Sequence, residues 1–215
     1  MERLSIQSFL GNGHAYRLYG FERPANMPDG VEYRQATDIL PNVDPAEYAA
    51  LATYADYFRY ALLSQCGGWW ADMDVVCLRP FMATGYVFAS EVTDSGSAIA
   101  NNAVMRAPAG SPVMEFAVKV CASKEPGEVT WGELGPRLLD VAVRGFGLSA
   151  YVAAPETFCP LSYREWGRLL DEGSVPDSQA IHLWGEMWRQ WSRDKDARYS
   201  GACPYERLKL RYAVV

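Results

Sequence analysis

The sequence predicts a single α/β domain with a mostly parallel central sheet. Predicted helices and strands alternate along the chain, which is the order expected when helices cover the faces of such a sheet. With 215 residues, the chain is long enough for one sizeable core and short for two. Its residues are 49% hydrophobic and 13% aromatic, as is typical of a folded domain. We therefore expect one domain that spans residues 1–215.

Charge and composition exclude several classes of protein. The net charge is −6 and no basic block is dense enough to follow a phosphate backbone, so we expect no nucleic-acid partner. No apolar run reaches transmembrane length, and the first ten residues do not resemble a signal peptide. We expect a protein of the cytoplasm or of the inner face of the membrane. The five widely spaced cysteines favour buried free thiols over disulfides or a zinc site.

The N-terminal part of the chain is predicted to contain one helix and two strands. Residues 2–10 are compatible with a helix that ends at the following glycines. Residues 15–19 form the first predicted strand, and a loop rich in proline and glycine over 22–30 leads to a short strand at 31–33.

The clearest helix signal follows. Asp44 is suited to the N-cap, Pro45 to the first helical position, and Glu47 to the position from which a side chain bonds the cap's own N–H. Gly67 is suited to closing this helix in a left-handed conformation. One face is predicted to pack on a core because apolar residues recur at helical spacing, at Leu51, Tyr54, Ala55, Phe58, Leu62 and Cys66.

A short aromatic strand and two aspartates come directly after this helix. Trp69 to Ala71 form the strand, and Asp72 and Asp74 follow it. Side chains alternate in a regular strand, but in a loop at the strand's end both carboxylates can reach one cation. Carboxylates suit Mg²⁺ or Mn²⁺ held together with the phosphates of a substrate. The same spacing in 194–196 lies in a charged segment without a preceding strand, where solvent exposure is expected.

The rest of the chain continues the alternation. A Ser-Pro pair is predicted to open the helix at 112–121, and Gly145 and Gly147 end the helix at 130–144. The predicted elements after the aspartates are strands at 86–92 and 99–106, helices at 112–121 and 130–144, a strand at 151–154, a helix at 163–170, a strand at 180–184 and a helix at 205–212.

These motifs together resemble one known family. The sequence Asp56-x-x-Arg59, then Gly67-Gly68, then Trp70-x-Asp72-x-Asp74 resembles the sugar-binding DXD glycosyltransferases. That group contains yeast mannosyltransferases, mammalian α-1,4-galactosyltransferase, bacterial capsule and lipopolysaccharide enzymes, and the catalytic domains of clostridial toxins. Further similar segments are Asn102 to Pro112, Gly135-Pro136, and His182-x-Trp184 with Trp188. The resemblance implies a Rossmann-like GT-A fold that here lacks the family's first strand, which carries a Trp-x-Gly element.

The resemblance also implies catalytic and metal-binding roles. Asp74 would coordinate Mn²⁺ or Mg²⁺ directly, and Asp72 would share the metal or hold the ribose. His182 is expected either to assist the metal or to be a satisfied core side chain. Asp56 would bond the hydroxyls of the donor sugar and Arg59 would bond the sugar or the diphosphate, although spacing alone equally predicts an ion pair within the helix.

Four further residues complete the expected donor site. The Asn102 amide would contact the donor sugar or cap a turn. Trp70 is expected either to wall the donor pocket or to belong to the core. Trp184 and Trp188 would close over the donor as a lid or form an aromatic packing cluster. Gly185 departs from the polar residue that the family usually has in this segment.

The function implied is metal-dependent, retaining transfer of a hexose from a nucleoside diphosphate sugar, with a UDP-sugar favoured. The acceptor would be a saccharide or a lipid-linked molecule, as in polysaccharide biosynthesis. Two alternatives stay open. The run Trp69 to Leu78 also resembles the first motif of haloacid-dehalogenase-type phosphatases, in which Asp72 would attack phosphorus and Asp74 would act as acid and base. The chain could instead be an inactive, sugar-binding remnant of the transferase family.

Overall fold

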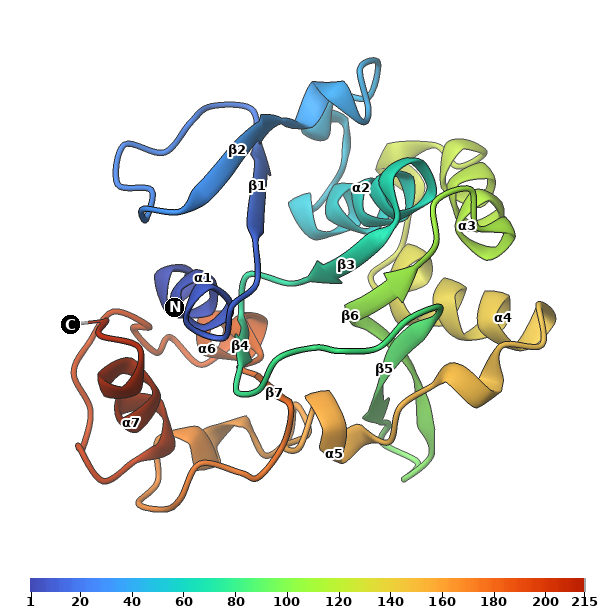
Figure 1. Cartoon of the computed structure of the whole chain (residues 1–215). Helices are drawn as coiled ribbons and strands as arrows, with labels where there is room; N and C mark the ends of the chain where they lie inside the picture. The colour runs from blue at the N-terminus through green and yellow to red at the C-terminus, as the bar shows by residue number, and fades with distance from the viewer. Residues whose placement is uncertain (215) are drawn as a thin grey trace.

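The computed structural model describes residues 1–214 and shows an α/β arrangement with three small sheets. The seven strands found in these residues are β1 Tyr16–Gly20, β2 Val31–Gln35, β3 Gly68–Ala71, β4 Val75–Cys77, β5 Val87–Val92, β6 Ala98–Ala107 and β7 Ala180–His182. The seven α-helices are α1 Glu2–Gly11, α2 Leu51–Cys66, α3 Pro112–Ala122, α4 Leu138–Gly145, α5 Pro155–Phe158, α6 Gly185–Gln190 and α7 Pro204–Arg211. Figure 1 shows α1, α6 and α7 gathered on one side and α2, α3 and α4 on the other.

The mostly parallel sheet expected from the alternation of elements is not confirmed. Only β1 and β2 pair in parallel among the strands in residues 1–214, whereas β3 with β6, β5 with β6, and β4 with β7 are antiparallel. β5 and β6 are joined by a tight turn in which the Thr93 amide donates to the Ser97 carbonyl at 2.8 Å. So short a connection can join antiparallel strands but not parallel ones.

The start predicted for the central helix is wrong. The Asp44 carboxylate does accept a hydrogen bond from the Ala46 amide at 2.8 Å, but it caps only a 3₁₀ turn, Pro45–Glu47. The backbone is then extended at Tyr48, whose ring packs against Tyr54 at a centroid distance of 5.9 Å. Helix α2 therefore begins at Leu51, after the local capping signal has already been used.

The predicted end of α2 is confirmed, for a steric reason. Gly67 has φ 62° and ψ −167°, a conformation that is essentially restricted to glycine. A Cβ atom at Gly67 would lie 2.4 Å from the backbone nitrogen of Ala109. The glycine thus lets two backbones approach closely at the point where the chain turns from α2 into β3.

Three predicted elements in the second half are shorter than expected. The helix expected at 130–144 is divided into a π turn, Glu133–Arg137, and α4, because Gly135 has non-helical torsions and Pro136 follows it. The strand expected at 151–154 is reduced to one bridge between Phe88 and Val152. The helix expected at 163–170 is a 3₁₀ turn, Trp166–Leu169. The other short 3₁₀ turns are Ala36–Asp38, Pro126–Glu128 and Ser149–Tyr151.

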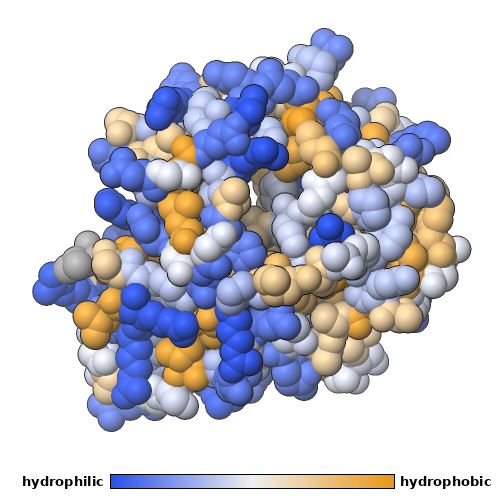
Figure 2. Space-filling model, viewed as in Figure 1, coloured by the Kyte–Doolittle hydropathy of each residue, from blue (hydrophilic) through white to orange (hydrophobic). Residues whose placement is uncertain are grey.

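Two clusters of buried side chains form the interior. One surrounds β4 and β7 and includes side chains of α1 and α7, and the other lies among α2, α3, α4 and β6. Four of the five free cysteines are buried and Cys66 is exposed. No helix in residues 1–214 is both long and apolar enough to cross a membrane. The face shown in Figure 2 is largely hydrophilic, with apolar patches and a hollow near its middle.

Candidate active site

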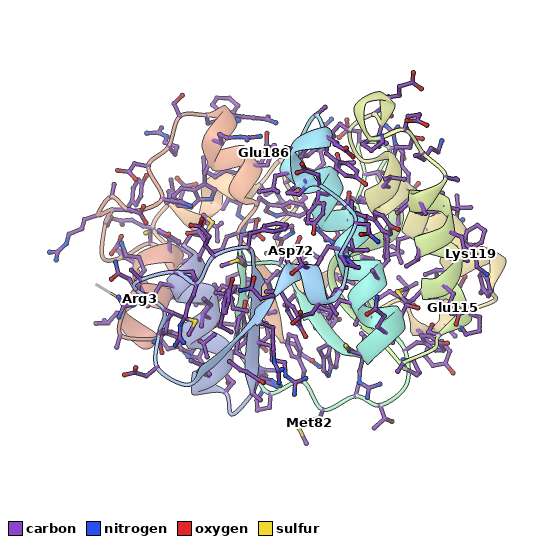
Figure 3. All side chains as sticks on the ribbon, turned by 90° about the horizontal axis from the view of Figure 1, so that it is seen from above. Arg3, Asp72, Met82, Glu115, Lys119 and Glu186 are labelled. Atoms are coloured by element: carbon purple, nitrogen blue, oxygen red, sulfur yellow. The ribbon has the colours of Figure 1, made fainter. Side chains whose placement is uncertain are left out.

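The two aspartates lie in the loop that leaves one sheet and enters another. β3 pairs with β6 and β4 pairs with β7, so the chain changes sheet between Ala71 and Val75. The strand's alternation of side chains is broken there, and Asp72 and Asp74 both line one cavity. Figure 3 places Asp72 near the middle of the molecule. The expectation that a loop would bring both carboxylates to one place is confirmed.

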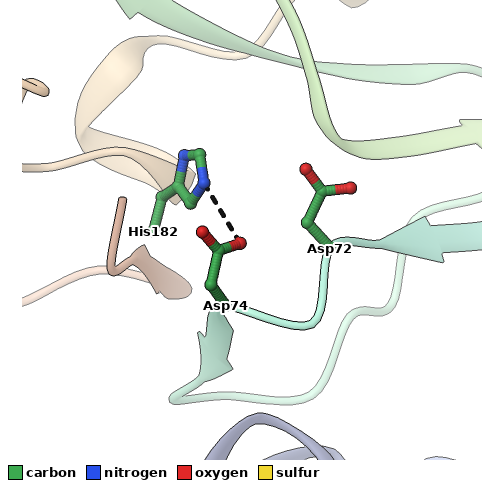
Figure 4. Close-up of side chains that lie close together, drawn as sticks. All are labelled: Asp72, Asp74 and His182. Carbon is green, nitrogen blue, oxygen red and sulfur yellow. Dashed lines mark ion pairs between the residues drawn. The ribbon is translucent and has the colours of Figure 1, made fainter. Parts of the chain in front are cut away.

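His182 completes a group of three potential metal ligands. β7 pairs with β4 so that His182 lies opposite Val75, next to the loop. One ligand atom each of Asp72, Asp74 and His182 lie within 4.8 Å of one another. The Nε2 atom of His182 is 3.2 Å from Oδ1 of Asp74. Figure 4 marks this ion pair with a dashed line. These three residues come from segments about a hundred residues apart, and the pairing of β4 with β7 joins them.

The charges of Asp74 and His182 stabilise each other. Burial by itself would raise the pKa of Asp74, but the charge and hydrogen bond of His182 and the amide of Gly185 lower that pKa to about 2. The Gly185 amide donates to Oδ2 of Asp74 at 2.7 Å. Burial would likewise lower the pKa of His182, yet the Asp74 carboxylate raises it well above its usual value. Without a metal, the pair is therefore an imidazolium with a carboxylate.

Gly185 has no side chain at the point where it meets Asp74. A Cβ atom on Gly185 would lie 3.1 Å from Oδ2 of Asp74, which is tighter than most real Cβ contacts. The glycine therefore lets the backbone amide reach the carboxylate directly. This contact is a physical reason for a glycine at this position.

Arg59 pairs with two carboxylates, those of Asp56 and Asp72. Its side chain is only 7% exposed, and its Nη1 atom lies 2.9 Å from Oδ1 of Asp72. Its Nη2 atom lies 3.2 Å from Oδ1 of Asp56, and Nη1 also donates to the Asn102 carbonyl at 2.8 Å. The ion pair within α2 is thus present, and the same guanidinium also reaches the DXD loop. The planar fork of arginine allows these separate contacts, which a single ammonium would not match.

Trp70 supports this ion-pair network from the strand. Its indole N–H donates to Oδ1 of Asp72 at 2.7 Å, and the guanidinium carbon of Arg59 lies 5.1 Å from the centroid of its ring. Burial raises the pKa of Asp72 even though Arg59 and this indole favour its ionised form. Trp70 does not line the cavity, so the structure places it behind Asp72 rather than at the surface of a pocket.

Asp56 and Asn102 meet at the start of the π turn. The Asn102 amide donates to Oδ1 of Asp56 at 2.8 Å. A Cβ atom on Gly135 would lie 2.9 Å from Oδ2 of Asp56, so only a glycine lets the backbone run this close to the carboxylate. The Tyr60 hydroxyl donates to the Gly135 carbonyl at 3.1 Å and fixes the turn against α2. Burial raises the pKa of Asp56 against the opposing effects of Arg59 and Asn102.

A cavity of about 740 Å³ connects these residues. Its size falls in the range of small-molecule sites. Seven of the nine residues predicted for the site line it, namely Asp56, Arg59, Asp72, Asp74, Asn102, His182 and Trp184.

Comparison with known proteins finds a similar sequence region in one family. Residues 13–90 match the family model described as the glycosyltransferase sugar-binding region containing the DXD motif. The match includes α2 with Asp56 and Arg59, and the loop with Asp72 and Asp74. Over these residues the chain is similar to the DXD glycosyltransferases.

Two known proteins are similar to this chain over longer stretches. Human α-1,4-N-acetylglucosaminyltransferase is 26% identical over 159 residues, which cover 66% of this chain and 45% of that protein. The chain therefore spans less than half the length of this relative. Among solved structures, the PaToxG glycosyltransferase superposes with a TM-score of 0.49 at 15% identity, over 67% of this chain and 62% of that one.

The two tryptophans of the C-terminal segment lie in different surroundings. Trp184 lines the cavity, where its ring lies 4.0 Å from that of His182, and its N–H donates to the Leu161 carbonyl at 2.8 Å. Trp188 is 1% exposed, and its N–H donates to the Leu183 carbonyl at 2.8 Å. Of the two expectations for Trp188, a lid over the donor or an aromatic packing cluster, the structure shows the packing cluster. It packs on Trp166 and Tyr205 as part of an aromatic core.

Glu91 is a cavity residue that sequence reasoning missed. It lies on β5, partly buried, and forms no ion pair within residues 1–214. Burial raises its pKa, against the opposing effects of His182 and Asn101. No local pattern in the sequence marks this glutamate, because its position in the cavity depends on the pairing of β5 with β6.

Proposed function

We propose that the chain transfers a hexose from a nucleoside diphosphate sugar to an acceptor hydroxyl, with the help of a divalent metal ion and with retention at the anomeric carbon. The observation that carries the proposal is the convergence of Asp72, Asp74 and His182 at one cavity. The similarity of residues 13–90 to the DXD glycosyltransferases supports the reaction class. Retention and the choice of a hexose rest on the family resemblance. For the fold, we propose a GT-A arrangement in which the DXD loop ends the strand after α2.

The three ligands fit a divalent ion. Two carboxylates and one imidazole provide hard oxygen atoms and one nitrogen, in a partly buried pocket beside the cavity. Mg²⁺ prefers oxygen ligands and retains its water, whereas Mn²⁺ accepts both oxygen and imidazole nitrogen. We therefore propose Mn²⁺ as the better match for this set, with Mg²⁺ as the second choice. When bound, such an ion supplies Lewis-acid stabilisation of the leaving diphosphate.

The chain's own side chains would hold the donor. Asp56 and Asn102 form one wall, and they are held in place by Arg59 and by the tight passage of Gly135. A carboxylate and an amide fixed in this way can accept from and donate to neighbouring sugar hydroxyls. Arg59 is too buried to follow a mobile substrate, so its proposed role is to set the positions of Asp56 and Asp72 and to add positive charge near the diphosphate.

A protein with a pocket for both ligands should bind metal and donor together. We would follow thermal unfolding with UDP-glucose, UDP-N-acetylglucosamine and GDP-mannose, with and without Mn²⁺, and then measure the best donor by calorimetry. Stabilisation that needs both the ion and the sugar nucleotide is the expected result. Asp74→Asn should abolish this coupling while the circular dichroism spectrum stays unchanged. Equal donor affinity in Asp74→Asn and the unmodified protein would contradict the proposed metal role.

The two alternatives give different results in the same experiment. A phosphatase of the haloacid dehalogenase type needs a further acidic pair near its two aspartates, but the third potential ligand found in residues 1–214 is His182. The family match also favours a glycosyltransferase. Metal-dependent hydrolysis of p-nitrophenyl phosphate would revive that alternative. Donor binding without either hydrolysis of the donor or transfer would indicate an inactive, sugar-binding protein.

A further inference from the structure

Trp131 is a large apolar side chain left in water at the rim of the candidate active site. It is 60% exposed, and it lines the same cavity as the metal-ligand group. A tryptophan gains free energy by burying its rings, so an exposed one beside a binding cavity indicates a surface that a ligand covers. Trp191 is similarly exposed, at 68%, but does not line the cavity.

The turn that carries Trp131 is held in place. The Thr130 amide and hydroxyl donate to Oε2 of Glu133 at 3.1 and 3.0 Å, so the residues on both sides of Trp131 are joined. Lys124 pairs with Oε1 of Glu133 at 2.6 Å, and the bonds to Lys124 and Thr130 lower the pKa of Glu133 to about 2. Gly132 has φ 73°, which lets the chain turn sharply after Trp131. The backbone of Trp131 is therefore pre-organised.

This turn leads directly to the wall proposed for the donor sugar. Gly135, four residues after Trp131, lies so close to Asp56 that an added Cβ atom would be 2.9 Å from its carboxylate and 3.5 Å from the Asn102 amide nitrogen. The diphosphate would lie at the other group of residues, near Asp74 and His182. The indole is thus attached to the sugar wall of the cavity and not to its metal side.

We infer that Trp131 is the stacking platform of an acceptor subsite that takes the ring of a saccharide. This inference rests on the proposed function and specifies the substrate class of the same site. Pyranose rings have an apolar C–H face that packs on an aromatic ring, and hydroxyl edges that need polar partners. Such partners line the same cavity at Glu91, Asn101 and Arg137. A nucleotide base would lie beyond the diphosphate, away from the donor sugar, so the indole fits the acceptor better than the base.

The subsite can be tested by binding, without turnover. We would record saturation-transfer difference NMR spectra of a set of methyl glycosides, in the presence of UDP and Mn²⁺, with the full chain and with variants. The unmodified protein should saturate the ring protons of one face of at least one glycoside. Trp131→Ala should lose this signal, Trp131→Phe should keep most of it, and Trp191→Ala should leave it unchanged. Absence of any signal in the unmodified protein, or an equal signal in Trp131→Ala, would overturn the inference.

Kinetic measurements then separate the acceptor from the donor. With the glycoside that binds, Trp131→Ala should raise the acceptor KM by about tenfold, the order expected for loss of one aromatic contact. The donor KM and the slow hydrolysis of the donor without acceptor should stay unchanged. A matching loss of UDP affinity in Trp131→Ala would assign the indole to the base and refute the acceptor assignment. If no donor is turned over but the NMR result holds, the proposed transfer fails while the saccharide subsite stands.

Discussion

Replacing Arg59 with methionine tests whether the ion-pair network is as central as the structure indicates. Methionine retains much of the length and apolar volume of the arginine stem but removes the guanidinium. Asp56 and Asp72 would lose a partner at 3.2 and 2.9 Å, and the Asn102 carbonyl would lose a donor at 2.8 Å. The side chains of the two carboxylates are only 14% and 24% exposed, so water replaces the lost contacts only in part.

The expected loss of stability is large at neutral pH. Removing one partner from a buried ion pair costs about 3 to 5 kcal/mol. Because both carboxylates retain some access to the cavity, we expect the Arg59→Met loss near the lower end, about 3 kcal/mol. Burial already raises the pKa values of Asp56 and Asp72, and loss of the guanidinium would raise them further. A carboxyl whose folded pKa is above its unfolded value favours folding as it takes up a proton, so the loss should shrink as the pH falls.

The assay is urea unfolding without divalent ions, followed by circular dichroism at neutral and mildly acidic pH. Arg144→Met is a matched control, because Arg144 pairs with Asp140 at 2.8 Å but has a side chain 62% exposed. Its loss should stay below about 1 kcal/mol. If Arg59→Met costs no more than Arg144→Met, or if its cost does not change with pH, the reasoning about two uncompensated carboxylates is refuted.

Three further perturbations address the metal, the backbone and the missed glutamate. His182 has a raised pKa and must release the proton on Nε2 to bind a metal through that atom, so Mn²⁺ affinity should rise between about pH 6 and 8. In calorimetry, the Mn²⁺ affinity of His182→Asn should depend less on pH. Gly67→Ala should lower the free energy of unfolding by about 3 kcal/mol or more, because Gly67 has a positive φ and the new Cβ would lie 2.4 Å from a backbone nitrogen. Gly127→Ala is the control: its Cβ would meet nothing within 4 Å, so it should cost little in the same urea titration. Glu91→Gln should reduce turnover without weakening Mn²⁺ binding. It should leave stability equal or higher, because burial of a carboxylate without an ion-pair partner disfavours folding above its raised pKa. Lower stability with full turnover would show that the role of Glu91 is structural.

Local sequence signals predicted that helices and strands are present more accurately than they predicted where each one begins and ends. The double glycine after α2 predicts the end of the helix correctly, because glycine is the residue type that readily adopts a positive φ. Asp44, Pro45 and Glu47 carry an equally clear capping pattern, yet the structure satisfies it within a single 3₁₀ turn. A short pattern can be fulfilled by one turn as well as by a long helix, and the packing of Tyr48 on Tyr54 decides between them.

The site residues that belong to a sequence motif could be predicted. Those that reach the site through the pairing of strands or through a turn could not. Asp72 and Asp74 follow a recognisable strand, so their loop could be foreseen. Glu91 reaches the cavity through an antiparallel pairing and Trp131 through the turn before the π turn, and neither leaves a periodic signal. For Trp188 the sequence left both a lid and a packing cluster open, because an aromatic residue next to a motif looks the same in sequence whether it faces a ligand or the core.

The balance of charge in the site indicates an order of binding. When Asp56, Asp72 and Asp74 are ionised, Arg59 and a protonated His182 leave one excess negative charge in the ion-pair network. This field repels the diphosphate of a sugar nucleotide. Exchange of the imidazole proton for a divalent ion removes the excess, because two positive charges replace one. We therefore expect the ion to bind before or with the donor, so that the apparent donor affinity increases with Mn²⁺ concentration and levels off when the site is filled. Donor affinity independent of Mn²⁺ would show that other groups, outside this network, neutralise the diphosphate.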